Sequence, residues 1–129
     1  MDSKELGRLG ERRAVWFYRM RGYSIVGRNV RLRGGEIDLV VQRRHVLAFV
    51  EVKTRQSLAA GEGFEAVDRD KQLRLVRLAD AYLARCPHRG EVRYDVLSLF
   101  WTGTHFIITH YPDAFQAVSD PRRPWRWTM

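Results

Sequence analysis

Two consecutive apolar segments, Ile37–Val41 and Val46–Val52, constrain the fold of this chain most strongly. Both consist mainly of Val, Leu and other apolar residues, and a short polar connection separates them. Apolar runs of this length that are joined by a tight polar turn are typical of a β-hairpin, and runs as apolar as these are typical of central strands. The sequence therefore predicts a hairpin in the middle of a sheet.

The turn of this hairpin determines which residues face each other. If Arg44 and His45 form a two-residue turn, Asp38 falls opposite Glu51. The other pairs that this register predicts are Arg43 with Val46 and Val41 with Ala48. Because paired residues share one face of a sheet, the two carboxylates would lie within roughly 5 Å of each other at their Cβ atoms. A register shifted by one residue would instead place Asp38 on the other face.

Lys53 shares a face with Glu51, because side chains two apart on a strand point the same way. Two carboxylates ~4 Å apart repel each other by about 4 kcal/mol at an effective dielectric constant near 20, and burial adds a desolvation cost. A divalent cation would offset this repulsion, and Mg²⁺ prefers carboxylates together with water and substrate phosphate. Asp38, Glu51 and a carbonyl such as that of Val52 therefore form a candidate metal site, in which Lys53 would orient a water or stabilise a transition state. The alternative is a structural ion pair between Lys53 and one of the acids.

The other elements follow from periodicity and from turn residues. Asp2 or Ser3 is expected to cap a first helix that ends near Arg21, and Gly34-Gly35 marks a turn. The expected strands are Tyr23–Leu32, Glu36–Gln42, Val46–Thr54, Val92–Phe100 and His105–Tyr111, with a polar loop at Gln56–Gly63 and a second helix from Val67 to about Arg85. This order predicts a mixed α/β domain.

The first helix contains a further acid, Glu11. Small residues on the same side of the helix, at Gly7, Gly10 and Ala14, would let the helix approach the sheet closely and turn Glu11 inward. The alternative is that Glu11 pairs at the surface with Arg8 or Arg12. Periodicity alone does not separate the two. Elsewhere, we expect Asp95 to be structural and to pair with Arg93 or a helix arginine, and Cys86 to be a small buried residue near a helix end.

The chain is strongly basic, with 23 Lys and Arg against 15 Asp and Glu and a net charge of +8. An excess of this size favours a polyanionic partner such as nucleic acid. Candidate arginines flank the acids on strands and turns: Arg28, Arg31, Arg33, Arg43, Arg44 and Arg55. Binding to a nucleic-acid backbone through such residues would weaken steeply with salt. The alternative is that these arginines only form a solvated basic face. For any one arginine considered by itself, this alternative remains open.

The length of the chain, 129 residues, suits one domain, which we expect to span 1–119 and to be followed by a basic Trp/Pro/Arg tail at 120–129. A single cysteine, Cys86, excludes an internal disulfide and favours a reducing compartment. The segment Met1–Gly10 is polar and charged, unlike a signal peptide, and no apolar run approaches the ~20 residues that span a bilayer. We therefore expect a cytoplasmic protein that does not bind membranes.

Several stretches resemble one known family. They are GERRA at Gly10–Ala14, RN at Arg28-Asn29, GEIDLV at Gly35–Val40, FVEVKTR at Phe49–Arg55, AVDRDKQ at Ala66–Gln72, ADAYL at Ala79–Leu83 and VRYDV at Val92–Val96. Together they resemble the YraN-like family of small bacterial proteins, from about Glu5 to Phe100. More distantly the chain resembles the archaeal Holliday-junction resolvases and the PD-(D/E)xK nucleases. That resemblance implies a restriction-endonuclease-like core of order α-β-β-β-α-β, with a mixed central sheet flanked by helices.

The resemblance also implies roles. Asp38 matches the first acid of the motif, although it follows Ile rather than Pro, while Glu51 with Lys53 matches ExK and Glu11 the helix acid of the resolvases. Gln72 matches a second-helix Gln or Lys, and Lys71 is a rival for that position. The implied activity is Mg²⁺- or Mn²⁺-dependent endonuclease hydrolysis of DNA rather than RNA, on branched or damaged structures, by a homodimer. A nucleic-acid-binding protein that keeps the nuclease fold without cleaving, and an adaptor in which the acids and Lys53 form only a salt bridge, remain alternatives.

Overall fold

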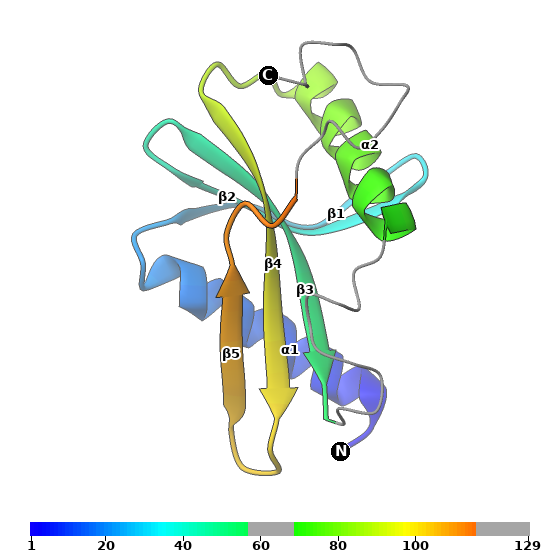
Figure 1. Cartoon of the computed structure of the whole chain (residues 1–129), viewed down its shortest axis with the longest axis vertical. Helices are drawn as coiled ribbons and strands as arrows, with labels where there is room; N and C mark the ends of the chain where they lie inside the picture. Colours follow the sequence, from blue (N-terminus) through cyan, green and yellow to red (C-terminus); the bar gives the residue numbers. More distant parts are fainter. Residues whose placement is uncertain (57–68, 116–129) are drawn as a thin grey trace.

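The computed structural model describes residues 1–56 and 69–115. Its elements follow the predicted order (Figure 1). They are α1 (Ser3–Arg19), β1 (Ser24–Leu32), β2 (Gly35–Arg43), β3 (Val46–Arg55), α2 (Arg69–Arg85), β4 (Glu91–Trp101) and β5 (Phe106–Tyr111). The start of the second helix at Val67, most of the predicted polar loop and the tail at 120–129 lie outside the described residues.

The strands form one five-stranded sheet in the order β1-β2-β3-β4-β5. Neighbouring strands are antiparallel except for β3 and β4, which are parallel, so the sheet is mixed as predicted. The predicted hairpin register is confirmed: Arg43 pairs with Val46 and Val41 with Ala48. The turn residue Arg44 has a φ of 55°, as expected in a two-residue hairpin turn.

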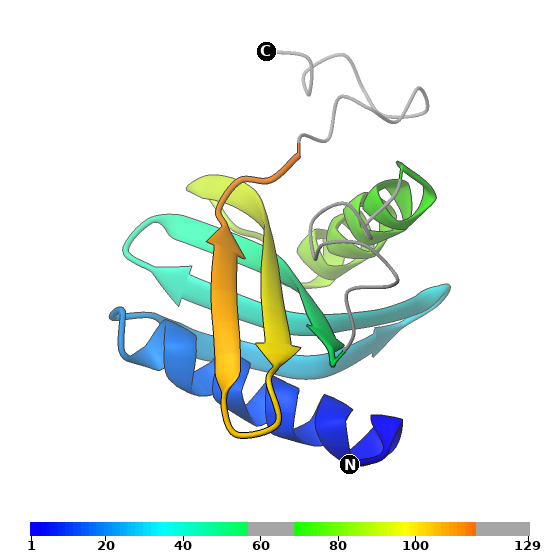
Figure 2. The same ribbon diagram turned by 60° about the horizontal axis from the view of Figure 1, so that its bottom comes forward.

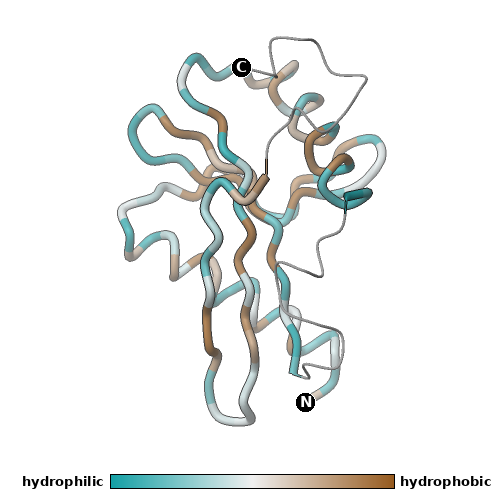
Figure 3. The backbone as a smooth tube through the Cα atoms, in the orientation of Figure 1, coloured by the Kyte–Doolittle hydropathy of each residue, from teal (hydrophilic) through white to brown (hydrophobic). Residues whose placement is uncertain are grey.

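The two helices cover opposite faces of the sheet (Figure 2). On the α2 side, Phe49, Tyr94 and Val96 pack against Leu75 and its neighbours. The α1 side is built from a second set of buried residues, which includes Tyr18, Leu39, Val41, Val50, Leu97 and Leu99. Apolar residues mark the strand centres and polar residues the turns of the hairpins (Figure 3). Both faces of β3 and β4 are therefore buried, which explains why their sequences are nearly continuous apolar runs.

The ends of α1 follow from local hydrogen bonds. Asp2 caps the helix, and its Oδ1 accepts a bond from the Glu5 N–H at 2.8 Å. The helix ends at Arg19 rather than near Arg21, because Gly22 takes a φ of 86° and the Tyr23 N–H turns back to the Tyr18 carbonyl. This left-handed glycine ends the helix and aims the chain into β1.

One glycine of α1 sets how closely the helix approaches β3. A Cβ on Gly10 would overlap the Thr54 side chain, whereas a Cβ on Gly7 would meet nothing within 4 Å. The expectation that small residues allow close approach therefore holds at Gly10 and is wrong at Gly7. No helix in the described part of the chain is both long and apolar enough to cross a membrane.

Candidate metal and nucleic-acid site

The sheet opens between β2 and β3 beside Asp38. Backbone pairing between these strands ends at Leu39 and Val50, while β3 continues to Arg55 paired only with β4. At the opening, the Oδ2 atom of Asp38 accepts a hydrogen bond from the Val52 N–H at 2.8 Å. The Asp38 carboxylate thus accepts a hydrogen bond from β3 just beyond the last backbone pair of the two strands. This bond fixes the position of the carboxylate against β3.

The carboxyl groups of Asp38 and Glu51 lie together at this opening. Burial, and after it the neighbouring Glu51 carboxylate, raise the pKa of Asp38 from 3.8 to about 8. The Val52 N–H opposes this increase, while Glu11 adds to it. A half-buried acid with so high a pKa is short of nearby positive charge. A divalent cation would supply that charge, so the oxygen donors present here fit Mg²⁺ or Mn²⁺.

Glu11, on α1, lies at this opening beside Asn29, a residue for which the sequence predicted no role in the site. With its amide nitrogen facing the acids, Asn29 donates to Glu11 Oε2 and to Glu36 Oε1, each at 3.2 Å. Asn29 has a φ of 49° and interrupts the β1–β2 pairing, which places its side chain beside the helix. Glu11 lies near enough to Asp38 to raise its pKa, and within residues 1–56 and 69–115 it forms no ion pair with an arginine. Its role as a metal ligand stays a prediction.

Lys53 lies on the same face of β3 as Glu51, two residues further along. Burial lowers the pKa of Lys53, and the ammonium group of Lys71, which lies beside it, lowers it further. The Glu51 carboxylate acts in the opposite direction. Of the two α2 candidates, Lys71 is therefore placed against Lys53, and Gln72, the next residue of the helix, is half-buried.

Glu11, Asp38 and Glu51 do not already form a closed metal cage. Among the described residues, no group of three or more His, Cys, Asp or Glu side chains is gathered closely enough to hold an ion. A pair of carboxylates is nevertheless the usual protein contribution to a Mg²⁺ site that also uses waters and substrate phosphate. Glu11 and the Val52 carbonyl remain predicted additional ligands.

The predicted nucleic-acid-binding arginines separate into groups. Arg43 and Arg44 lie at the hairpin tip, and Arg43 is roughly 17 Å along β2 from Asp38 at ~3.3 Å per residue. Arg43 donates to the Arg21 carbonyl at 2.8 Å and lies over the Tyr23 ring. The structure therefore does not bring the tip arginines to the acids.

The other four arginines have different surroundings. Arg28 is exposed on β1, and Arg31 pairs with Glu36 at 3.4 Å. Arg55 follows Lys53 on the same face of β3, and its buried Nη1 atom has no hydrogen-bond partner among residues 1–56 and 69–115. Arg33, in the β1–β2 turn, lines a basic cavity with α2. Arg33 and Arg55 are thus the predicted arginines closest to the α2 side of the sheet.

A second polar centre, which we call the Asp95 network, lies on the α1 side. Asp95 is fully buried, and five hydrogen bonds reach its carboxylate. They come from Tyr18 Oη (3.0 Å), Arg93 Nε (2.8 Å) and Nη2 (2.9 Å), His110 Nε2 (2.9 Å) and the Asp113 N–H (3.0 Å). The predicted Asp95–Arg93 pair is confirmed. The contributions of Tyr18 and His110 were missed, and Cys86, expected to be buried, is exposed.

These features define a class of protein. A mixed five-stranded sheet between two helices, in the order α-β-β-β-α-β-β, is an α/β fold consistent with a restriction-endonuclease-like core. Residues 10–99 match the model of a family described as "Uncharacterised protein family UPF0102". The chain belongs to this family, which is the YraN-like family of the sequence comparison above.

Individual relatives support the assignment. A UPF0102 protein of Symbiobacterium thermophilum is 53% identical over 98 residues, which are 75% of this chain and 83% of the relative. A relative in Dictyoglomus thermophilum is 40% identical over 77% of this chain and 85% of its own length. A third, in Chlorobium phaeobacteroides, is 41% identical over 86% of this chain and 94% of its own length.

Proposed function

We propose that this protein is a divalent-metal-dependent endonuclease that hydrolyses phosphodiester bonds of DNA. The observation that carries the proposal is the Asp38 carboxyl, held by the Val52 N–H against Glu51 with a pKa raised to about 8. Two carboxylates kept together in this way disfavour each other and favour a cation. The net charge of +8 fits a polyanionic substrate.

The side chains divide the work as follows. Asp38 and Glu51 hold Mg²⁺ or Mn²⁺, with Glu11 and the Val52 carbonyl as further ligands. Such an ion lowers the pKa of a bound water and polarises a phosphoryl oxygen. Lys53, whose pKa is lowered by burial and by Lys71, donates hydrogen bonds to the attacked phosphate or orients the attacking water. Branched or damaged DNA is the substrate we propose to test first.

The test is cleavage of plasmid, flap and four-way-junction DNA with Mg²⁺ or Mn²⁺. We expect the single-turnover rate of Lys53→Ala to fall at least about 100-fold, as is typical when one donor to a developing charge is removed. Lys4→Ala is the matched control, because Lys4 is exposed on α1, and its rate should equal that of the wild type.

If the wild type and Lys53→Ala bind DNA equally and give the same background cleavage, the endonuclease proposal is wrong. The protein would then be a nucleic-acid-binding protein with a nuclease fold. Calorimetric titration of Mg²⁺ or Mn²⁺ into the wild type, Asp38→Ala and Glu51→Ala separates the endonuclease from a structural ion pair. The endonuclease should bind metal as the wild type and lose this binding in both variants, whereas a structural ion pair would bind no metal in any of the three.

A further inference from the structure

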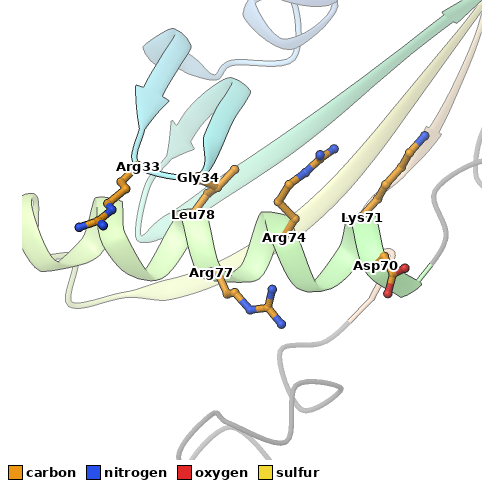
Figure 4. A pocket seen from close by; sticks show the side chains of 7 residues that line it. All are labelled: Arg33, Gly34, Asp70, Lys71, Arg74, Arg77 and Leu78. Carbon is orange, nitrogen blue, oxygen red and sulfur yellow. The ribbon is translucent and has the colours of Figure 1, made fainter.

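A cavity of about 380 Å³ lies between α2 and the β1–β2 turn (Figure 4). Its lining comes from two places: Arg33 and Gly34 in the turn, and Asp70, Lys71, Arg74, Arg77 and Leu78 on α2. Gly35 brings the two together, since a Cβ there would lie 3.3 Å from Leu78 and 3.8 Å from Arg74. The cavity is therefore built by tertiary packing, and no local sequence pattern describes it.

The lining carries a large excess of positive charge. Four of its side chains are basic and only Asp70 is acidic. Within residues 1–56 and 69–115, Arg33 and Arg74 make no hydrogen bond or ion pair. Two guanidinium groups beside a cavity, neither paired with a carboxylate in the described part of the chain, favour an anionic ligand with several acceptor oxygens.

One residue, Lys71, links the lining of the cavity to the candidate site. Lys71 lines the cavity and also lies against Lys53, which follows Glu51 on β3. Lys71 and Arg74, one helical turn apart, extend to the same side of α2, whereas Asp70 and Arg77 extend to the other (Figure 4). Basic groups thus run from the acids, through Lys53 and Lys71, to Arg74 and the turn that holds Arg33.

We propose that this cavity is a phosphate-binding subsite for the nucleic acid cleaved at Asp38 and Glu51. The inference rests on the proposed function in taking nucleic acid as the ligand. The subsite holds a phosphate group near the attacked one, either inside the strand or at its end, and so positions the substrate. Arg33 and Arg74 are positioning residues in this account, because they touch the substrate away from the reacting atoms.

The test measures binding of short blunt DNA duplexes in the absence of divalent metal. The variants are Arg74→Gln and Arg33→Gln, which change the helix and the turn independently. Arg85→Gln is the matched control, because Arg85 is exposed on the same helix and does not line the cavity. Three duplexes, with a 5′-phosphate, a 3′-phosphate or hydroxyl ends only, distinguish the sources of the phosphate.

We expect Arg74→Gln and Arg33→Gln each to weaken binding about tenfold, as for one lost charged hydrogen bond. Each should also reduce the slope of log K against log salt by about 1, while Arg85→Gln changes neither quantity. An effect on all three duplexes assigns the subsite to an internal phosphate; an effect on one phosphorylated end assigns it to that terminus.

If both variants bind every duplex as Arg85→Gln does, the subsite is wrong, even if the wild type cleaves DNA. Conversely, charge-dependent binding without any cleavage would leave the subsite standing and would overturn the nuclease proposal. The two failures are therefore distinguishable.

Discussion

Asp38 and Asp95 are both withdrawn from solvent at the centre of the sheet, yet their surroundings shift their acidity in opposite directions. Burial and the Glu51 carboxylate raise the pKa of Asp38 to about 8. Burial would also raise the pKa of Asp95, but hydrogen bonds from His110 and Arg93 and from the Asp113 N–H lower it to about 2. The difference lies mainly in the neighbours, because Asp95 is the more deeply buried of the two and still has the lower pKa.

The two centres are close in the sheet but face opposite layers. Asp95 pairs with Val50 in the β3–β4 register, and Glu51 is the next residue of β3. Side chains alternate between faces, so Asp95 joins Tyr18 on the α1 side while Glu51 faces the α2 side. A carboxylate with a full set of donors stabilises the fold. A carboxylate beside another acid destabilises it unless a ligand compensates.

Removing Asp95, whose carboxylate has a full set of hydrogen-bond donors, should have the largest effect on stability. Asp95→Ala removes the carboxylate that pairs with Arg93, which among the described residues keeps only its bond to Tyr23 Oη, and that accepts from Tyr18. We expect the free energy of unfolding to fall by about 3–5 kcal/mol, because the Arg93 charge stays half-buried without its counter-ion. Chemical denaturation measures this change. The matched control, Glu91→Ala, removes an exposed acid from the same strand and should change stability by less than about 0.5 kcal/mol. A loss below about 1 kcal/mol for Asp95→Ala would contradict the structural role of the network.

Removing the Asp38 carboxylate, which lies beside another acid, should instead increase the free energy of unfolding. Because the folded-state pKa of Asp38 is about 8 and its ordinary value is 3.8, its protonation stabilises the fold fully below pH 3.8. This stabilisation is lost as the pH rises through 8. The amide in Asp38→Asn does not titrate and can still accept the Val52 bond. Without divalent metal, we expect this variant to exceed the wild type by about 2–4 kcal/mol at pH 9 and to match it near pH 4.

The measurement is the free energy of unfolding of both proteins across that pH range. Glu36→Gln, which removes an exposed acid from β2, should show no such dependence relative to the wild type. If Asp38→Asn were less stable than the wild type at every pH, Asp38 would be a structural acid like Asp95.

Helix α1 serves both centres, carrying Glu11 to one and Tyr18 to the other. Gly10→Ala would press a methyl group against Thr54 and lift this part of the helix, at a cost of about 1–2 kcal/mol after the gain in helix propensity. Gly7→Ala, one turn earlier and open to space, should be neutral or stabilising by up to about 1 kcal/mol. Thermal unfolding compares the two. Equal effects would mean that α1 does not depend on close contact at Gly10.

The part of the site that lies within one hairpin could be predicted from the sequence. A two-residue turn and alternating faces are local rules, and they sufficed to bring the Asp38 side chain beside that of Glu51 and to put Lys53 on the same face as Glu51, although the backbone pairs of β2 and β3 end one position earlier, at Leu39 and Val50. The order of all elements followed for the same reason. The predicted end of α1 was less exact, because the position where this helix ends depends on the left-handed Gly22.

Contacts that depend on tertiary packing could not be predicted. Asn29 meets Glu11 at a position of positive φ that the β1–β2 pairs skip, between Arg28 and Val30. His110 meets Asp95 only in the β4–β5 register. The contact of Lys71 with Lys53 depends on the rotation of α2 about its axis, which packing of its apolar face on the sheet determines. These residues carry no local pattern that identifies them.

The most direct test of the account follows the Asp38 carboxyl carbon by NMR during a pH titration, with and without Mg²⁺. Without the metal, we expect a titration midpoint near pH 8, well above the ordinary value of 3.8. Saturating Mg²⁺ should lower that midpoint by several units, because the ion stabilises the carboxylate. A midpoint near 3.8 that Mg²⁺ leaves unchanged would show that Asp38 and Glu51 do not form a cation site.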